Sequence, residues 1–343
     1  MCFVLDKIMF FCYHLMLIRG YVGIFLMKNM FRSRFLEVGM TALVIGLIAL
    51  PFVGFAKDGD KIYVDKDASG TQNGSSAHPY EKISQGLDNA ENGDEVIVSS
   101  GTYKERVSIP KGVKLSGAGK GKTIIKSSSN HDDAVITMKD DAKLWGVTVE
   151  NGELGIYVRE NAKVEISGSE IKGNRHEGIF IEKGDRSDKE KVSIIDCDIE
   201  KNGWSGVYSK KRKVVLMDSD IKYNKKNGVV FESGVRAWID DNSISENVGS
   251  GLVMNLDGAD ITIASGSAFR KNGREGIEIS SFGATGNINV KKSKFIENEH
   301  YGVARISRVA NIPTSVWSGL ALAKDIEYSG NDMGTISPIV RGF

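Results

Sequence analysis

The sequence has few cysteines and prolines for its length. Of 343 residues, three are cysteine and five are proline, and two of the cysteines, Cys2 and Cys12, stand near the amino terminus. Beyond residue 56 only Cys197 remains, so this part of the chain has no second cysteine for an intrachain disulfide. Basic and acidic residues nearly cancel, at 45 against 44. That balance argues against a basic surface for nucleic acid, which is not an expected partner.

The amino-terminal segment, residues 1–56, differs in composition from the rest. Residues 38–56 carry no charge and follow basic residues such as Arg32 and Arg34. This order is typical of a secretory signal peptide, and a membrane anchor is the alternative because about 20 apolar residues span a bilayer. We therefore expect a secreted, periplasmic or cell-surface protein, with membrane contact only through an uncleaved segment. We interpret residues 1–26 as preceding the true translation start.

A repeat with a period of 22 to 28 residues follows this segment. The pattern Asn-x-x-x-Gly before an aliphatic residue occurs seven times. Apolar and polar positions alternate beside it, which is typical of strands with one buried face. Units this short cannot be separate domains, so we expect them to stack, each strand parallel to its equivalent in the next unit. The seven asparagines are Asn151, Asn174, Asn202, Asn224, Asn247, Asn272 and Asn298.

The two repeated residue types predict how the turn is built. Asparagine tolerates a left-handed backbone, and its side-chain amide both donates and accepts hydrogen bonds, so stacked asparagines can form a ladder. Glycine would supply the unusual backbone angles at the same turn. Five positions before each asparagine stands a small polar residue, and Cys197 takes this place in one unit. We interpret Cys197 as a buried structural residue.

This repeat resembles that of right-handed parallel β-helix proteins of the pectate-lyase-like superfamily, and the likeness covers residues 61 to about 330. Residues 62–126 are similar to the first module of secreted bacterial β-helix proteins, with a strand at 62–64, a Gly/Ser-rich loop and a short helix beginning near Pro79. In that family such a helix caps the open end of the core. The resemblance implies an all-β, right-handed, single-stranded parallel β-helix solenoid with a short N-terminal capping helix.

The chain divides into four segments on this interpretation. Residues 1–56 form the signal peptide or membrane anchor, and residues 57–125 form the N-terminal cap module of the β-helix. The β-helix repeats occupy residues 126–308. Residues 309–343 are expected to form the last coil and the C-terminal cap.

One outward-facing column is not explained by core packing. It lies between the two inward positions after each repeated glycine, and it holds three aromatic residues in successive units, followed by valines. Two residues further along, basic residues alternate with glutamates. Flat aromatic faces beside cations suit acidic sugars, and an elongated stripe suits a polymer. We therefore expect a polysaccharide, acidic if the cations take part, to bind at Tyr157, Phe180, Tyr208, Arg159 and Lys210.

Three hypotheses for the function remain open. The first is polysaccharide binding on this column. The second is a polysaccharide lyase or epimerase acting on uronate polymers, with Arg159, Lys210 and Tyr208 near the sugar carboxylate, although no complete catalytic motif of a known β-helix enzyme is present. The third is a structural or adhesive surface rod, in which the column is an oligomer contact. For the column itself, the alternative to ligand binding is that its stacked side chains simply stabilise the sheet.

No metal or other cofactor is expected. Histidines stand singly and the repeat region has one cysteine, so a zinc site has too few ligands. Residues 65–70, DKDASG, imitate the first half of a calcium-binding loop, but Ser76 stands where a bidentate glutamate belongs. Calcium is kept as an alternative.

Overall fold

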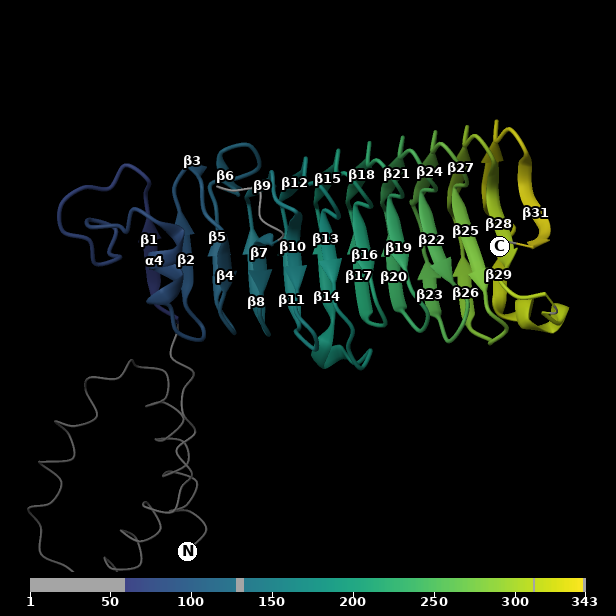
Figure 1. The fold of residues 1–343 in the computed structure, drawn as a ribbon, viewed down its shortest axis with the longest axis horizontal. Coiled ribbons are helices and arrows are strands. Elements are labelled where there is room, and N and C mark those ends of the chain that lie inside the picture. The colour runs from purple at the N-terminus through teal and green to yellow at the C-terminus, as the bar shows by residue number, and fades with distance from the viewer. Residues whose placement is uncertain (1–58, 128–132, 311, 342–343) are drawn as a thin grey trace, which may run out of the picture. The chain divides into compact units, whose positions relative to one another are not determined.

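The computed structural model describes residues 59–127, 133–310 and 312–341. Within them the chain is a parallel β-solenoid whose coils contribute strands to three long sheets. Neighbouring strands in each sheet come from consecutive coils, so hydrogen bonds join every coil to the next (Figure 1). The predicted leader, residues 1–56, lies outside the described residues. No helix in the described ranges is long and apolar enough to cross a membrane.

Sheet 1 contains eleven parallel strands. In spatial order they are β1 (Lys61–Val64), β2 (Glu95–Val98), β5 (Lys114–Ser116), β8 (Ala142–Trp145), β11 (Val164–Ser167), β14 (Val192–Ile195), β17 (Lys213–Met217), β20 (Arg236–Asp240), β23 (Asp260–Ile263), β26 (Asn287–Val290) and β29 (Leu320–Leu322).

Sheets 2 and 3 contain ten strands each, and sheet 2 carries the predicted aromatic column. Sheet 2 consists of β4 (Val107–Ile109), β7 (Ala134–Met138), β10 (Leu154–Val158), β13 (Ile179–Ile181), β16 (Val207–Ser209), β19 (Val229–Phe231), β22 (Leu252–Asn255), β25 (Ile277–Ser281), β28 (Tyr301–Ser307) and β31 (Gly334–Arg341). Sheet 3 consists of β3 (Gly101–Tyr103), β6 (Thr123–Lys126), β9 (Thr148–Glu150), β12 (Glu170–Lys172), β15 (Asp198–Glu200), β18 (Asp220–Lys222), β21 (Ser243–Ser245), β24 (Ala268–Arg270), β27 (Lys294–Ile296) and β30 (Glu327–Ser329).

Inward side chains of all three sheets form one continuous hydrophobic core. On sheet 3, Ile171, Ile199 and Ile221 pair in register and are fully buried. Later coils place aromatic rings in the same column, where Phe269 and Phe295 stack with their centroids 5.1 Å apart. Burial of apolar surface, at about 25 cal/mol per Å², is thus repeated in every coil. The prediction of an all-β solenoid with strands stacked in parallel is confirmed.

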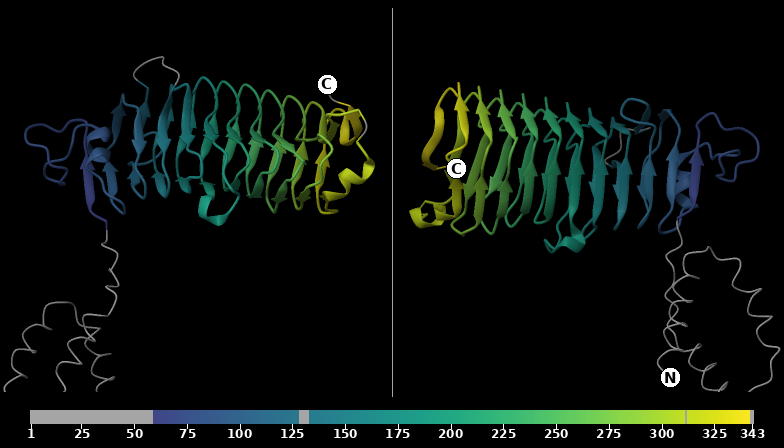
Figure 2. Two further views of the ribbon diagram at one scale, coloured as in Figure 1. Left: turned by 60° about the horizontal axis from the view of Figure 1, so that its bottom comes forward. Right: turned by 180° about the vertical axis from the view of Figure 1, so that it is seen from behind.

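One short α-helix, α4 (Ile83–Asp88), closes the core at the first coil. It begins four residues later than predicted, because Glu105 accepts hydrogen bonds from the backbone N–H groups of Ile83 (2.9 Å) and Ser84 (3.0 Å) and so fixes the first turn. Ile83 and Leu87 are buried. Two 3-10 helices complete the described elements: η1 (Asp188–Glu190), in a segment that projects from the regular stack (Figure 2), and η2 (Thr314–Gly319).

Asparagines form the predicted ladder between sheets 3 and 2. Asn224 is typical of its members, because its Oδ1 accepts hydrogen bonds from both the backbone and the side-chain nitrogen of Asn202, each at 3.1 Å. Asn331 extends the ladder at its carboxyl end. Asn151 lies outside it, because this side chain is exposed and the N–H of Gly152 donates to the next asparagine instead.

The predicted left-handed backbone is found at only one of the seven repeated asparagines, Asn151 (φ 61°). At the other six, the left-handed residue is the one before the asparagine, as at Lys201 (φ 55°) and Tyr223 (φ 58°). The repeated glycine has no left-handed backbone. A Cβ on Gly206 would lie 2.9 Å from the side-chain nitrogen of Asn224 and 2.8 Å from the carbonyl oxygen of Gly228. Glycine is therefore required because the next coil approaches so closely.

Candidate functional site

Sheet 2 carries three aromatic side chains in successive coils on its outer surface. Tyr157 of β10 pairs in register with Phe180 of β13, which pairs with Tyr208 of β16. Their ring centroids are 5.9 and 5.2 Å apart, with interplanar angles of 22° and 10°. Val230 and Val253 continue the same register on β19 and β22. The predicted alignment is confirmed, and we call Tyr157, Phe180 and Tyr208 the aromatic row.

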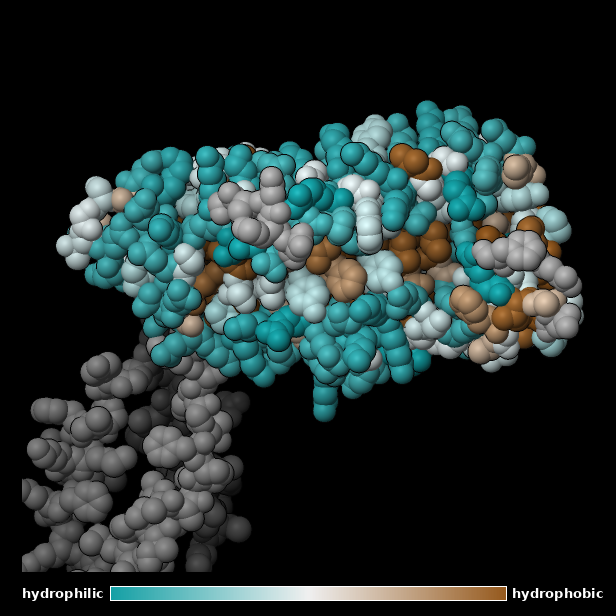
Figure 3. Space-filling view, viewed as in Figure 1, coloured by the Kyte–Doolittle hydropathy of each residue, from teal (hydrophilic) through white to brown (hydrophobic). Residues whose placement is uncertain are grey.

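The aromatic row is half-buried, not fully exposed as the sequence had suggested. Near-parallel rings at this separation are offset-stacked, so each ring covers part of its neighbour and leaves part at the surface. Figure 3 shows apolar side chains gathered along the middle of this face between hydrophilic margins. Tyr157 is the first ring of the row, since Thr137 occupies its register position on β7. One side of Tyr157 therefore has no aromatic neighbour.

An open groove lies at this end of the row. It has a volume of about 620 Å³ and is lined from β4, β7 and β10 by residues that include Thr137, Leu154 and Tyr157. Two arginines also line it. Arg106 forms an ion pair with Asp133 at 2.7 Å, whereas the exposed guanidinium of Arg159 has no ion-pair partner among the described residues. The groove thus combines an aromatic wall with a cation available to a ligand.

Lys210 lies over the row but is already neutralised. Its ammonium nitrogen is 5.2 Å from the centroid of the Phe180 ring and 2.9 Å from a carboxylate oxygen of Glu182. The hydrogen bond to Glu182 raises the pKa of Lys210. Burial opposes ionisation of Glu182, yet the bond from Lys210 lowers the pKa of that carboxyl below its ordinary value. Lys210 is therefore a cation held in place by its own partner.

Tyr208 is held as a neutral phenol. Its hydroxyl donates a hydrogen bond to Glu232, a partner that the sequence analysis placed in the neighbouring charged column without assigning it this role. Burial, followed by the bond to Glu232, raises the pKa of Tyr208 well above its usual range. Burial also raises the pKa of Tyr157. Both hydroxyls therefore stay protonated at neutral pH.

Comparisons with known proteins agree on the architecture. Residues 185–312 match the family described as right handed beta helix region, and residues 67–216 match a family described as protein of unknown function (DUF1565). No curated protein matches the sequence. The chain folds as a right-handed parallel β-helix.

Three solved structures illustrate the similarity of this β-helix to known ones. The Dettilon tailspike protein (gp208) has a TM-score of 0.53 and 15% identity, covering 80% of this chain and 61% of its own. XylC, solved in complex with xylose, has a TM-score of 0.52 and 12% identity, with coverages of 72% and 67%. Pectate lyase Pel9A has a TM-score of 0.46 and 18% identity, with coverages of 81% and 77%. At these identities the likeness shows the fold alone.

The β-helix buries a carboxyl near the aromatic row that sequence reasoning missed. Glu177 precedes β13 and is 5% exposed, and its charge contributes to the raised pKa of Tyr208. Burial raises the pKa of Glu177 itself. The available signal was chemical: the adjacent units place Leu154 and Ser205 at this position, and only one other unit has a glutamate there, Glu275.

Replacing Glu177 with glutamine is expected to stabilise the β-helix at pH 7 by about 1 kcal/mol. The pKa of Glu177 is higher in the folded state than its ordinary value of 4.5. The protonated carboxyl therefore contributes fully to stability at a pH below 4.5, and this contribution is lost as the pH rises through the folded-state pKa. Urea unfolding at pH 7 and pH 4 measures the difference, which should shrink at the lower pH. An equal change at both pH values would contradict the assignment.

Trp204, at a turn of the β-helix, offers no open ring face. Its indole stacks on His176 with centroids 4.1 Å apart, and the ammonium of Lys226 lies 3.9 Å from its centroid. The exposed position of Trp204 (40%) therefore reflects a side chain with both faces in contact. It is not counted as part of the site.

The described residues contain no cluster of three or more histidine, cysteine or acidic side chains able to hold a metal ion. In the segment that imitates a calcium loop, the Asp65 carboxylate accepts from the backbone N–H of Asp67, and Asp67 pairs with Lys66 at 2.6 Å. These contacts account for the aspartates within the local turn.

Proposed function

We propose that the protein binds a polysaccharide in the groove beside Tyr157 and along the aromatic row. The observation that carries this proposal is the position of the groove at the uncovered end of three stacked rings. An aromatic face packs against the apolar face of a sugar ring, and the polar groups around it can bind hydroxyls. Because the rings follow the solenoid axis in successive coils, a chain of sugars fits better than a single one.

The proposal includes a preference for acidic sugars. Arg159 lines the groove and has no ion-pair partner among the described residues, so its guanidinium is available for a carboxylate or sulfate. Lys210 contributes less than the sequence suggested, because Glu182 already neutralises it. XylC, a protein of similar fold, was solved with xylose bound, which supports a saccharide ligand by analogy of fold.

Tyr157→Ala is expected to weaken binding of the polysaccharide by about tenfold or more, because it removes a stacking contact worth on the order of 1 kcal/mol together with the groove wall. Tyr208→Ala should cost less, since its ring is covered by Phe180 and its hydroxyl is engaged by Glu232. Affinity gels loaded with acidic and neutral polymers measure both effects. Tyr223→Ala, an exposed tyrosine at a turn, is the matched control. Unchanged binding in the Tyr157 variant would remove the site assignment.

A lyase or epimerase activity is the competing proposal, and protonation argues against it. Proton abstraction beside a uronate carboxylate needs a base. Tyr208 and Lys210 both have raised pKa values and hold their protons. We expect no ultraviolet absorbance from unsaturated product when pectate, alginate or a glycosaminoglycan is incubated with the protein and calcium. Appearance of that absorbance would favour the enzyme.

The location outside the cytoplasm also stays a proposal, supported by the charge-free segment at residues 38–56. Cell fractionation together with amino-terminal sequencing of the mature protein tests both export and cleavage. Light scattering of the purified protein separates a monomeric binding protein from a rod that assembles through its surface.

A further inference from the structure

Sheet 1 presents a tryptophan whose surroundings differ from those of Trp204. Trp238 lies in the middle of β20 and is 46% exposed. No ring or cation packs on its indole among the described residues, whereas both faces of Trp204 are in contact. Its register neighbours are Val215 on β17 and Thr262 on β23, both smaller than an indole. The indole therefore stands above its neighbours with ring surface open to solvent.

Trp238 lines a second groove, which is separate from the one on sheet 2. This groove has a volume of about 350 Å³ and is formed by β17, β20 and β23 with the end of the projecting segment before β14. Polar groups surround the indole, including the hydroxyl of Thr262. Three basic side chains stand in successive coils along one margin: Lys191, Lys213 and Arg236.

Two of these three cations are neutralised inside the protein. Arg236 pairs with Asp260 at 3.0 Å, and Lys213 pairs with Asp188 of the projecting segment. Lys191 has no ion-pair partner among the described residues. Lys191 is half-buried and lines the groove. It is thus the cation of this margin that a ligand can engage without breaking an existing pair.

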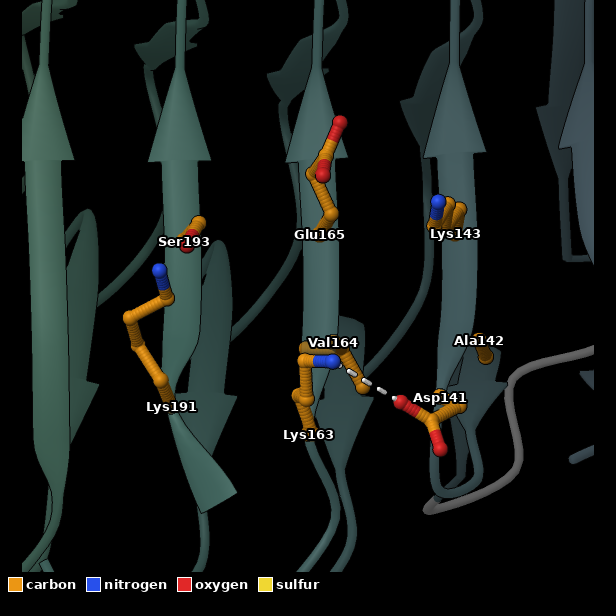
Figure 4. Close-up of a pocket in the computed structure, with 8 residues that line it drawn as sticks. All are labelled: Asp141, Ala142, Lys143, Lys163, Val164, Glu165, Lys191 and Ser193. Carbon is orange, nitrogen blue, oxygen red and sulfur yellow. Dashed lines mark ion pairs between the residues drawn. The ribbon is translucent and has the colours of Figure 1, made fainter. Parts of the chain in front are cut away.

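The same lysine borders a small adjoining hollow. Figure 4 shows Lys191 on the β14 side of this hollow, while Lys163 is turned toward Asp141, with which it pairs at 3.2 Å. The hollow has a volume of about 130 Å³ and is also lined by Lys143 and Glu165. Lys191 therefore lines both depressions and, unlike Lys163, is not paired with an aspartate among the described residues.

We propose that the Trp238 groove is a second saccharide-binding site, which takes an acidic sugar unit with its ring on the indole and its anionic group on Lys191. An indole face stacks on the apolar side of a sugar, while the hydroxyl and charged groups at its margin bind the sugar hydroxyls and the acid. The site goes beyond the proposed function, because it uses different strands, a different sheet and different residues. It gives one chain two separate contacts with a polymer, or with two polymers.

Calorimetric titration of the full chain with a purified oligogalacturonate tests the second site, with a neutral xylo-oligosaccharide as the comparison. In the Tyr157→Ala/Tyr208→Ala background, we expect one remaining site per chain that prefers the acidic oligomer. Trp238→Ala and Lys191→Gln should each weaken it by about tenfold. Trp145→Ala is the matched control, since Trp145 has the same exposed fraction of 46% on the same sheet but does not line the groove. It should leave the affinity unchanged.

The outcomes separate the two sites. Loss of all binding in the double tyrosine variant, or affinity within about twofold of the parent in Trp238→Ala, overturns the second site and leaves the first in place. A Trp145→Ala variant that binds as weakly as Trp238→Ala also overturns it, because binding would then follow general apolar exposure. If the tyrosine variant binds as the wild type does and Trp238→Ala abolishes binding, the second site stands and the function proposed for sheet 2 fails.

Discussion

Replacing Arg212 with methionine should lower the free energy of unfolding by about 4 kcal/mol, because removal of a buried cation leaves its hydrogen-bond partners unsatisfied. Arg212 is fully buried. Its guanidinium donates to the carbonyl oxygens of Glu190 (2.9 Å), Glu182 (3.0 Å) and Lys183 (2.7 Å), and also to that of Ala162. Among the described residues, no carboxylate is hydrogen-bonded to it. Methionine matches much of the apolar stem but can donate none of these bonds.

Urea unfolding followed by circular dichroism measures the effect of the Arg212 change. Arg212→Lys should be intermediate, because an ammonium keeps the charge but reaches fewer of the carbonyls than the planar guanidinium. Lys211→Met, at the exposed neighbouring position, is the control and should stay close to the wild type. Proteolysis at residues 183–190 should accelerate in Arg212→Met, since these carbonyls hold both ends of that segment. A stable, protease-resistant Arg212→Met variant would show that the carbonyls find other donors.

The second large effect is expected at the asparagine ladder. Asn224→Leu should destabilise the protein by about 3 kcal/mol or more, because several buried polar groups lose their partners at once. The side-chain nitrogen of Asn224 donates to the carbonyl of Ile199 at 3.2 Å and to Asn247 at 2.9 Å, and its oxygen accepts two bonds from Asn202. Leucine has a similar volume, so the loss reports mainly on hydrogen bonding.

Two companion variants sharpen the measurement at the ladder. Asn151→Leu changes the one repeated asparagine that is exposed and outside the ladder, so it should cost only about 1 kcal/mol, the strain of a leucine in the left-handed backbone of this position (φ 61°). Gly206→Ala should destabilise although it adds only a methyl group, because that carbon would meet the side-chain nitrogen of Asn224 at 2.9 Å. Equal stability of Asn224→Leu and Asn151→Leu would mean that the ladder contributes nothing beyond packing.

The stacking of strands and the register of the aromatic row could be predicted because both depend on sequence spacing alone. Once the coils are aligned on the repeated asparagine, period-two alternation decides which residues face outward. Tyr157, Phe180 and Tyr208 were placed one above the other in this way, and their pairing is confirmed. The roles of these residues in ligand binding remain predictions.

Other features depend on three-dimensional environment and were missed. The groove beside Tyr157 forms between coils, and Arg159 is available there because the neighbouring acid, Glu182, bonds Lys210 instead. The conformations of the side chains decide which charged residues of a column form ion pairs. The spacing of these residues in the sequence does not predict those conformations. Burial of Glu177 was missed as well. The equivalent residues, from Leu154 to Tyr301, are all buried or half-buried, but their residue types differ from coil to coil and form no apolar column.

The turn was predicted with the correct residues and the wrong reasons. Asparagine and glycine both favour left-handed backbone in isolation, so the sequence suggested that role for each. In the stacked coils a stronger requirement applies. The side-chain amide of each asparagine must reach the asparagine of the next coil, and the repeated glycine must have no Cβ, because that carbon would collide with the next coil. Residues such as Lys201 then adopt the left-handed conformation, at a cost that the ladder offsets.

Each link of that ladder joins only adjacent turns of the chain. Loss of one asparagine therefore weakens the contact between the coils on either side of it and leaves the contacts between the other coils intact. Pulled from one end, such a molecule should open in small, evenly sized steps instead of a single rupture, with each step releasing about one repeat of chain. A protein anchored at one end and holding a polymer along its side would thus yield gradually under load.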